Sequence, residues 1–80
     1  MKDTPAQAMG KRIKELRLKK GYSQEQLAQM SHLDRTYITV LESGRRNLSI
    51  KGLARVCHGL DIDLMHFFDS PLFDNIFDED

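Results

Sequence analysis

The chain has 80 residues, with one cysteine and no tryptophan, and its twelve Lys and Arg residues balance twelve Asp and Glu residues. This length predicts one small domain with a marginal core, because a chain of this size buries only about 60% of its unfolded surface. One cysteine excludes an internal disulfide and favours the reducing cytoplasm. No apolar run is long enough to indicate a signal peptide or a membrane span.

The neutral total conceals an uneven distribution of charge along the chain. Residues 1–58 hold all twelve basic residues against five acidic ones, a formal charge of +7, whereas residues 59–80 hold seven acidic residues and no Lys or Arg. Such a division indicates that the basic part meets a polyanion and that the acidic end is kept away from it. The alternative is a solvated surface on which the charges are divided by chance.

The first predicted helix has clear signals at both ends. Thr4 as N-cap, Pro5 at the first position and Gln7 three residues after the cap predict its start, and Gly21 predicts its end. One apolar stripe follows at helical spacing and consists of Met9, Ile13 and Leu16.

Two short helices follow, close together in the chain. A second capping box at residues 23–26 predicts a helix that runs to about Met30, and Asp34 caps a third helix that ends near residues 43–44. Ile38 and Leu41 form the buried side of the third helix. Helices of about two turns joined by roughly three residues cannot lie antiparallel, so they cross steeply as a helix-turn-helix.

The remaining predicted elements complete an all-α bundle of about five short helices. Ser49 caps a fourth helix, and Asp63 caps a brief fifth helix over residues 64–68. The core face of the fourth helix consists of Ile50, Leu53, Val56, Cys57 and Leu60. Pro71 then breaks the chain, which divides the sequence into a helical domain over residues 1–70 and an acidic, apolar tail over residues 71–80.

The second and third helices resemble the Cro/repressor-type (XRE) helix-turn-helix family of bacterial and phage DNA-binding regulators. The resemblance covers about residues 9–68, and its markers are the pairs Ser23-Gln24, Leu27-Ala28, Tyr37-Ile38 and Leu41-Glu42. The string LDRTYITVLESGRRN at residues 33–47 is similar to the small controller proteins of restriction-modification systems. The resemblance implies a lambda-repressor-like fold and sequence-specific binding of double-stranded DNA by a transcriptional regulator.

The third helix is the candidate recognition helix. With Ile38 and Leu41 turned inward, steps of 100° place the other side chains on an exposed face, and the first residues of such a helix reach base edges in the major groove. Arginine is the bidentate partner of guanine, the methyl groups of threonine and valine suit a thymine methyl, and a threonine hydroxyl can bond either base class. The predicted base contacts are Arg35, Thr36, Thr39 and Val40, with Tyr37 at the flank.

Several polar residues around the recognition helix are candidate phosphate contacts. Arg45, Arg46 and Asn47 follow it directly, Gln24 opens the second helix beside free backbone amides, and Lys51 extends the basic surface. For the two arginines the alternative is an ordinary solvated loop. The resemblance further implies that Arg17 and Glu42 form an ion pair between the first and third helices, whereas the alternative for a basic residue is contact with phosphate.

The C-terminal part carries more large apolar residues than the core of four helices needs, which indicates an interface. The resemblance implies a homodimer on a palindromic operator, with half-sites about 34 Å apart. The predicted interface residues are Leu64, Phe67, Phe68, Phe73, Ile76 and Phe77. The alternative is that one or two of them cap the domain's own core. The tail is either a sixth helical turn on the partner or a disordered acidic end, on the side away from DNA.

Other function classes find little support in the sequence. Cys57, His58, His66 and His32 lack the spacing of a metal site, and no nucleophile with a base and no Gly-rich phosphate loop indicates an enzyme or a cofactor. From the length we expect one domain only, and therefore no second domain that would hold a small-molecule effector. RNA polymerase is a further candidate partner. The alternatives are an antitoxin or adaptor with the same fold, and, less favoured, an RNA binder, which would need exposed aromatic platforms.

Overall fold

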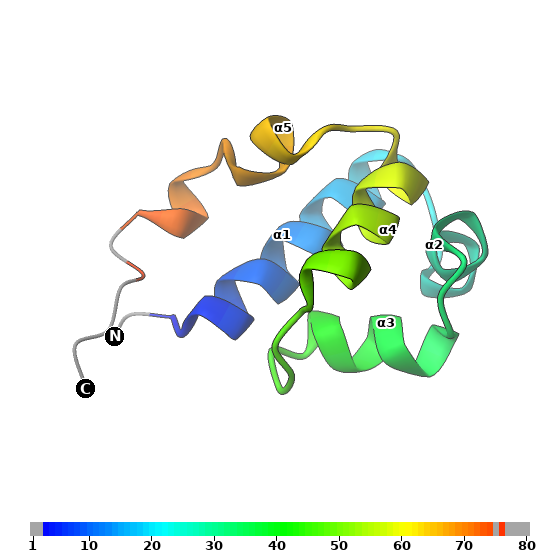
Figure 1. Cartoon of the computed structure of the whole chain (residues 1–80), viewed down its shortest axis with the longest axis horizontal. Coiled ribbons are helices and arrows are strands. Elements are labelled where there is room, and N and C mark those ends of the chain that lie inside the picture. The colour runs from blue at the N-terminus through cyan, green and yellow to red at the C-terminus, as the bar shows by residue number, and fades with distance from the viewer. Residues whose placement is uncertain (1–2, 75, 77–80) are drawn as a thin grey trace.

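The computed structural model describes residues 3–74 and 76, and this part of the chain holds five α-helices, one 3₁₀ turn and no strand. Figure 1 shows their order in space. The elements are α1 (Pro5–Lys19), α2 (Gln24–Ser31), α3 (Arg35–Glu42), α4 (Ile50–Leu60), α5 (Leu64–Phe68) and η1 (Pro71–Phe73). The all-α prediction is therefore confirmed.

Each α-helix begins at the cap that the sequence predicts. Thr4 and Gln7 make a reciprocal capping box, as do Ser23 and Gln26. The N-cap side chains of α3, α4 and α5 each accept a hydrogen bond from a backbone N–H in the first turn, and they belong to Asp34, Ser49 and Asp63. These caps satisfy amide groups that have no partner inside the helix, so they fix where each helix starts.

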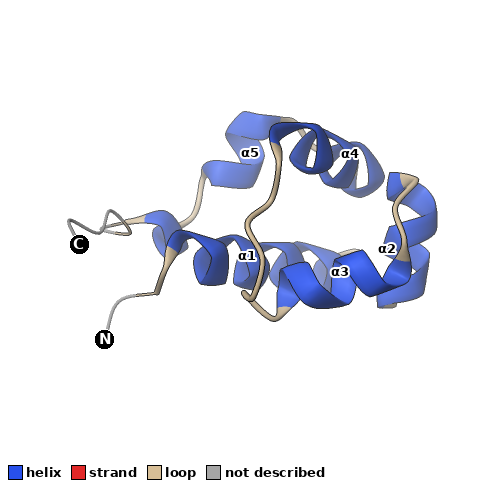
Figure 2. Cartoon of the chain, turned by 60° about the horizontal axis from the view of Figure 1, so that its bottom comes forward, coloured by secondary structure: helices blue, strands red, loops and turns tan. Residues whose placement is uncertain are grey.

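The helices pack as two connected pairs. α2 packs against α4 and α3, while α1 packs against α3 on one side and against η1 on the other. In Figure 1, α5 lies above α1 and α4, and α3 lies below them. Figure 2 shows the same separation, with α4 and α5 on one side and α1 and α3 on the other. The molecule therefore has an α3 side and an α5 side.

Close approach of α1 to α3 depends on a glycine. A Cβ atom on Gly10 would collide with the carbonyl oxygen of Leu41, so the two helix backbones approach at a distance that no larger residue allows. Because only three residues separate α2 from α3, the turn and the contact of α3 with α1 together fix the crossing of α2 and α3. The predicted helix-turn-helix is therefore confirmed as α2 and α3.

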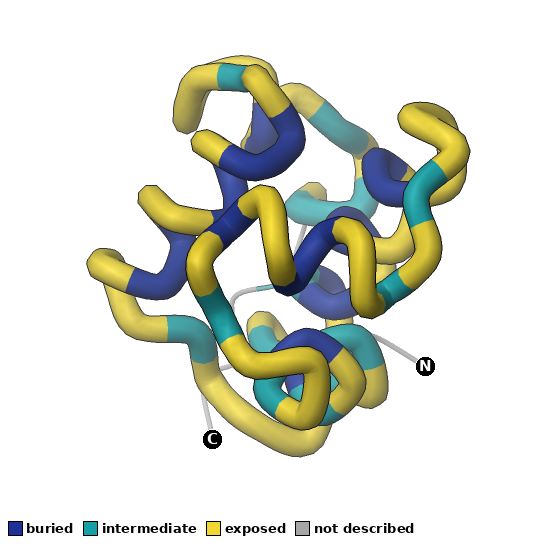
Figure 3. The backbone as a smooth tube through the Cα atoms, turned by 90° about the vertical axis from the view of Figure 1, so that its right-hand side faces the viewer, coloured by how far each residue is buried: buried dark blue, intermediate teal, exposed yellow. Residues whose placement is uncertain are grey.

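The core lies where the four longer helices meet, and Figure 3 shows buried segments alternating with exposed ones along the chain. Its buried apolar residues include Ile13, Leu16, Leu27, Ile38, Leu41, Leu53, Val56, Leu60 and Phe67. The prediction that Ile50 belongs to this core is wrong, because 79% of its surface is exposed. Ile50 is the first residue of α4, and side chains lean toward the N-terminus of a helix, so this one projects beyond the end.

No helix in the described part of the chain is long and apolar enough to cross a membrane.

Candidate nucleic-acid interface

The outer face of α3 carries the predicted base contacts. Arg35, Thr36 and Thr39 are exposed, whereas Tyr37 and Val40 are half-buried. On the opposite face Ile38 and Leu41 are buried, so the helix cannot rotate without losing its core contacts. The structure thus brings three of the five predicted residues together on one open surface.

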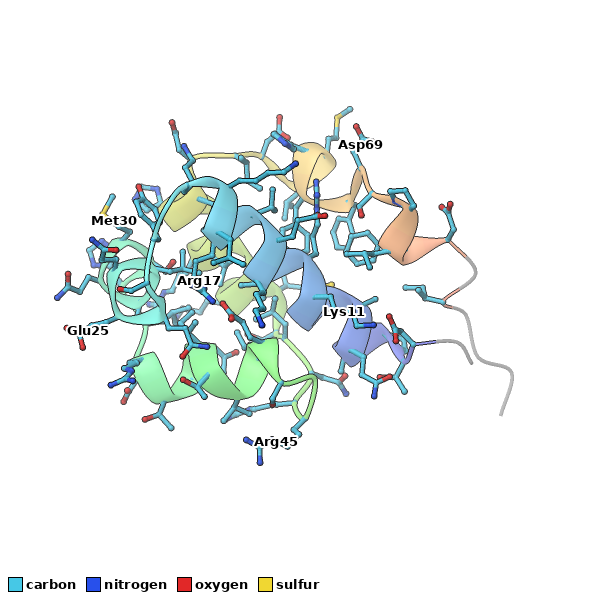
Figure 4. The ribbon with its side chains drawn as sticks, turned by 180° about the vertical axis from the view of Figure 1, so that it is seen from behind. Lys11, Arg17, Glu25, Met30, Arg45 and Asp69 are labelled. Atoms are coloured by element: carbon cyan, nitrogen blue, oxygen red, sulfur yellow. The ribbon has the colours of Figure 1, made fainter. Side chains whose placement is uncertain are left out.

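An ion pair holds α3 to α1. Nε of Arg17 donates to Oε2 of Glu42 at 2.7 Å, and Nη2 donates to Oε1 at 3.0 Å, the bidentate geometry that arginine makes with a carboxylate. The two side chains are only 9% and 4% exposed. This hydrogen-bonded carboxylate raises the pKa of Arg17, while burial acts in the opposite direction. Figure 4 shows Arg17 between α1 and the helices below it. Its third nitrogen donates to the carbonyl oxygen of Tyr22 at 2.8 Å.

The side chain of Gln24 continues this network to the surface. Its Nε2 donates to Oε1 of Glu42 at 3.1 Å, and its Oε1 accepts from Oγ1 of Thr39 at 2.9 Å. The sequence predicts Gln24 as a phosphate contact, but in the structure both ends of the side-chain amide bind protein groups. In this region, the groups of α2 that could bind an anion are therefore the backbone N–H groups of its first turn.

The loop after α3 presents the predicted phosphate contacts. Arg45, Arg46 and Asn47 are all exposed, and in Figure 4 Arg45 extends away from the body of the protein. Nε of Arg45 donates to Oγ of Ser43 at 3.0 Å, which holds its side chain near the end of α3. Lys51 is exposed in the first turn of α4.

The ring of Tyr37 contacts this loop through Arg46. The guanidinium carbon of Arg46 lies 5.1 Å from the centre of its ring, a cation–π contact. A Cβ atom on Gly52 would stand 2.8 Å from the Tyr37 hydroxyl, so the ring also packs against the start of α4. The sequence predicts Tyr37 at the flank of the reading face, and in the structure it packs between that face and α4.

The α5 side carries an exposed apolar surface. Leu64, Met65 and Phe68 are 46%, 83% and 45% exposed, and together we call them the α5 patch. An open groove between α4 and α5 adjoins it and is lined in part by Cys57, Leu64 and Met65. Burial raises the pKa of the Cys57 thiol, with a smaller contribution from the negative charge of Asp63.

The prediction that Phe67 belongs to the dimer interface is wrong. Its surface is fully buried inside its own chain, where α5 closes the core. Phe73 is half-buried and packs with its ring centre 5.9 Å from that of Phe67 and 5.0 Å from that of Phe68. Ile76 is half-buried, and Phe77 lies outside the described residues.

For the tail, the sequence left two alternatives open, a sixth helical turn on the partner or a disordered end. In the described part of the tail, residues 71–73 form a 3₁₀ turn that packs against α1 of the same chain.

Arg12 has a structural role that the sequence does not reveal. It is 5% exposed, and its guanidinium donates to the carbonyl oxygens of Phe67 at 2.8 Å, His66 at 2.8 Å and Asp69 at 3.2 Å. These carbonyls lie at the C-terminal end of α5, where the last carbonyl groups have no partner inside the helix, although that of His66 also accepts a hydrogen bond from the backbone N–H of Asp69. Arg12 therefore fixes α5, and with it the α5 patch, to α1. Backbone carbonyls cannot be recognised in a sequence, because every residue has one. The only signal for this contact is that a basic residue, Arg12, lies beside the core-facing residues of the first helix.

No group of three His, Cys, Asp or Glu side chains that could hold a metal ion exists among the residues that the structure describes. His32 and His58 stack with ring centres 6.2 Å apart, and Cys57 is buried on the core side of α4.

Comparisons with known proteins agree with this geometry. Residues 13–67 match a family model described as helix-turn-helix. The chain is 42% identical over 60 residues to control protein C.MunI of Mycoplasma sp, which covers 74% of this chain and 81% of that protein. It superposes on the controller protein C.AhdI from Aeromonas hydrophila with a TM-score of 0.75 and 41% identity, covering 79% and 96% of the two chains.

A second solved structure is that of the restriction-modification controller protein C.Esp1396I, as a tetramer in complex with its natural 35-base-pair operator. The match has a TM-score of 0.76 and 44% identity, and it covers 79% of this chain and 83% of that one. The relatives named here are control or controller proteins and not enzymes, which agrees with the prediction of a non-enzymatic protein.

Proposed function

The chain belongs to the helix-turn-helix family of DNA-binding regulators, and from this premise we propose that it binds a palindromic operator as a homodimer. Its similarity to control proteins supports a role in regulating a restriction-modification operon, its own gene included. In this role α3 enters the major groove, and the cations that follow it bind the flanking phosphates.

The observation that carries the proposal is the division of α3 into two faces. Arg35, Thr36 and Thr39 are exposed on one face, and the opposite face is held by the core and by the buried pair of Arg17 and Glu42. A reading surface of this kind must keep its orientation when it meets DNA, because base contacts depend on fixed donor and acceptor positions. The exposed cations of the loop supply the sequence-independent part of the binding energy.

The experiment that tests DNA binding starts with selection of sequences from a random duplex pool by the wild-type protein. Binding titrations at several salt concentrations then compare two arginine variants on selected and random DNA. We expect Arg35→Ala to lose discrimination at one base position, a loss of about 1–3 kcal/mol for a bidentate contact. Arg46→Ala should weaken binding to all sequences alike and lower the salt slope by roughly one. Equal losses of Arg35→Ala on both DNAs would refute its assigned role.

Support for the homodimer comes from the α5 patch, since a second copy that covers it would remove three large apolar side chains from water. Met65 is the most exposed of the three, so Met65→Asp leaves the fold intact while it places a charge in the interface. Its matched control is Ile50→Asp, because Ile50 is 79% exposed and lies at the start of α4.

We expect Met65→Asp to have the mass of a monomer by sedimentation at concentrations where the wild type and Ile50→Asp are dimers. A wild type that is monomeric and selects no DNA sequence would favour the other reading of the α5 patch, as the docking surface of an antitoxin or an adaptor.

A further inference from the structure

The chain of hydrogen bonds that begins at Arg17 has a fixed direction. An arginine side chain has only donors and an ionised carboxylate only acceptors, so Glu42 receives hydrogen bonds from every neighbour that it has. The oxygen of Glu42 that faces α2 is 3.1 Å from the side-chain amide of Gln24. Only the NH₂ end of that amide can face a carboxylate, and the carbonyl end therefore faces Thr39, three residues before Glu42 on α3.

The hydroxyl of Thr39 lies at the end of this chain. Its Oγ1 is 2.9 Å from the carbonyl Oε1 of Gln24 and 3.1 Å from the backbone carbonyl oxygen of Arg35. Both neighbours are acceptors, and a hydroxyl has a single hydrogen. That hydrogen is thus committed to the protein, and what Thr39 shows to the solvent beside α3 is oxygen lone pairs and a methyl group.

We propose that this relay through Arg17, Glu42 and Gln24 makes Thr39 an acceptor-only reader, which selects adenine or cytosine at the base it contacts. The proposal rests on the proposed binding of α3 in the major groove. There the exocyclic amino groups of adenine and cytosine are the hydrogen-bond donors, whereas guanine offers N7 and O6, and thymine O4, as acceptors. A lone pair that faces those acceptors makes no bond and repels them.

Thr36 provides the matched control for this inference. It is exposed on the same helix one turn earlier, and the described residues give its hydroxyl no hydrogen-bond partner. Its hydroxyl is therefore free to donate or to accept, so it can bond any of the bases. The two threonines differ in whether the hydroxyl hydrogen is bonded within the protein. For Thr39, the relay supplies the nearer acceptor through Gln24, and the backbone carbonyl of Arg35 supplies the second.

The test is selection from a random duplex pool, followed by sequencing, with the wild type and the variants Thr39→Val, Thr36→Val and Gln24→Met. Valine matches threonine in shape, and position 39 is exposed, so the variant keeps the fold; far-UV circular dichroism and thermal unfolding check this. The base position read by residue 39 is the one whose preference changes in Thr39→Val and not in Thr36→Val.

Every base pair holds one base with an exocyclic amino group, so the contacted strand is identified by replacing that base with an analogue that lacks the amino group. We expect the replacement to weaken binding by the wild type and not by Thr39→Val, because the amino group is the donor to the Thr39 lone pair. Thr39→Val should reduce the preference by about two- to tenfold, the value of one neutral hydrogen bond. Gln24→Met removes the nearer acceptor of the Thr39 hydrogen and leaves only the backbone carbonyl oxygen of Arg35. The hydroxyl can then turn to donate to a base, so guanine or thymine should gain on the contacted strand at the same position. In this scheme Gln24 is a positioning residue, and the identity of the selected base, rather than the overall affinity, reports its action.

Three results would overturn the relay: equal losses of binding by the wild type and Thr39→Val when the amino group is removed, no change of base preference in Thr39→Val, or an unchanged base preference in Gln24→Met. Each of them leaves the proposed function standing, because the wild type still selects a sequence. Failure of the wild type to select any sequence is the separate result that removes the proposed function, and the relay with it.

Discussion

The α3 side and the α5 side of the molecule are both tied to α1 by a buried arginine, but the two ties differ in kind. Arg17 binds the carboxylate of Glu42 and so holds α3, the proposed recognition helix. Arg12, five residues earlier, binds backbone carbonyls of α5 and so holds the apolar patch. The contact of Arg17 joins opposite charges on two helices, whereas the contact of Arg12 joins a charge to the dipoles of backbone carbonyls. The carboxylate that pairs with Arg12 belongs to the more exposed Glu15, which lies on α1 itself.

This difference predicts unequal consequences when each tie is cut. A buried charge that loses its countercharge is strongly destabilising, whereas a set of carbonyls that loses its donor can turn to water where the surface is near. The α3 side should therefore depend on its arginine for global stability. The α5 side should depend on its arginine mainly for local order and for assembly.

The largest expected effect is that of Glu42→Ala, which leaves the buried guanidinium of Arg17 without its carboxylate. We expect the free energy of unfolding to fall by about 3–5 kcal/mol. Urea unfolding followed by circular dichroism measures it. The control is Lys11→Ala, which breaks an exposed ion pair with Asp3 at 3.0 Å and should cost about 0–1 kcal/mol. Similar losses in the two variants would contradict a special role for burial.

An intermediate effect is expected for Arg12→Met, which keeps the apolar stem and removes every donor to the end of α5. We expect a loss of about 1–3 kcal/mol in the free energy of unfolding. The dissociation constant of the proposed dimer should also rise, because α5 presents the patch that a second copy would cover. Sedimentation at a series of concentrations measures that constant. A destabilised protein with unchanged dimerisation would separate Arg12 from assembly.

The smallest effect concerns the reactivity of Cys57, which lines the groove beside α5. Because burial raises the pKa of this thiol, less thiolate is present at any given pH, and labelling should be slower than that of an exposed cysteine. The labelling rate should increase with pH, with its midpoint above the ordinary pKa of a thiol. Arg12→Met should increase the rate at pH 8, whereas Lys11→Ala should not; equal rates in the two would show that the α5 side has not opened.

The sequence reveals the elements of this fold because their signals are local. The capping boxes of α1 and α2 and the caps of the later helices act within three residues, so the spacing of residue types identifies them. Ile50 fails for the opposite reason, since its spacing matches the core face of α4 while its place at the helix end takes it out of the core. Phe67 fails because a count of apolar residues cannot say which of them closes the core.

The candidate site divides in the same way. The exposure of Arg35, Thr36 and Thr39 follows from helical periodicity once the buried face of α3 is known. Helical periodicity does not reveal the two hydrogen bonds of the Gln24 side chain, because its partners lie 15 and 18 residues further along the chain. Contacts between elements that are distant in sequence require the packed structure, and the polarity of Thr39 is a property of such contacts.

Burial of the pair formed by Arg17 and Glu42 also has a consequence for release from the proposed operator. Dissolved ions weaken attraction between exposed charges, including the proposed contacts of loop cations with phosphates, but they screen a buried pair far less. Concentrated salt should therefore release the protein from its operator without altering the orientation of α3. Dilution would then restore binding at once, with no slow refolding step.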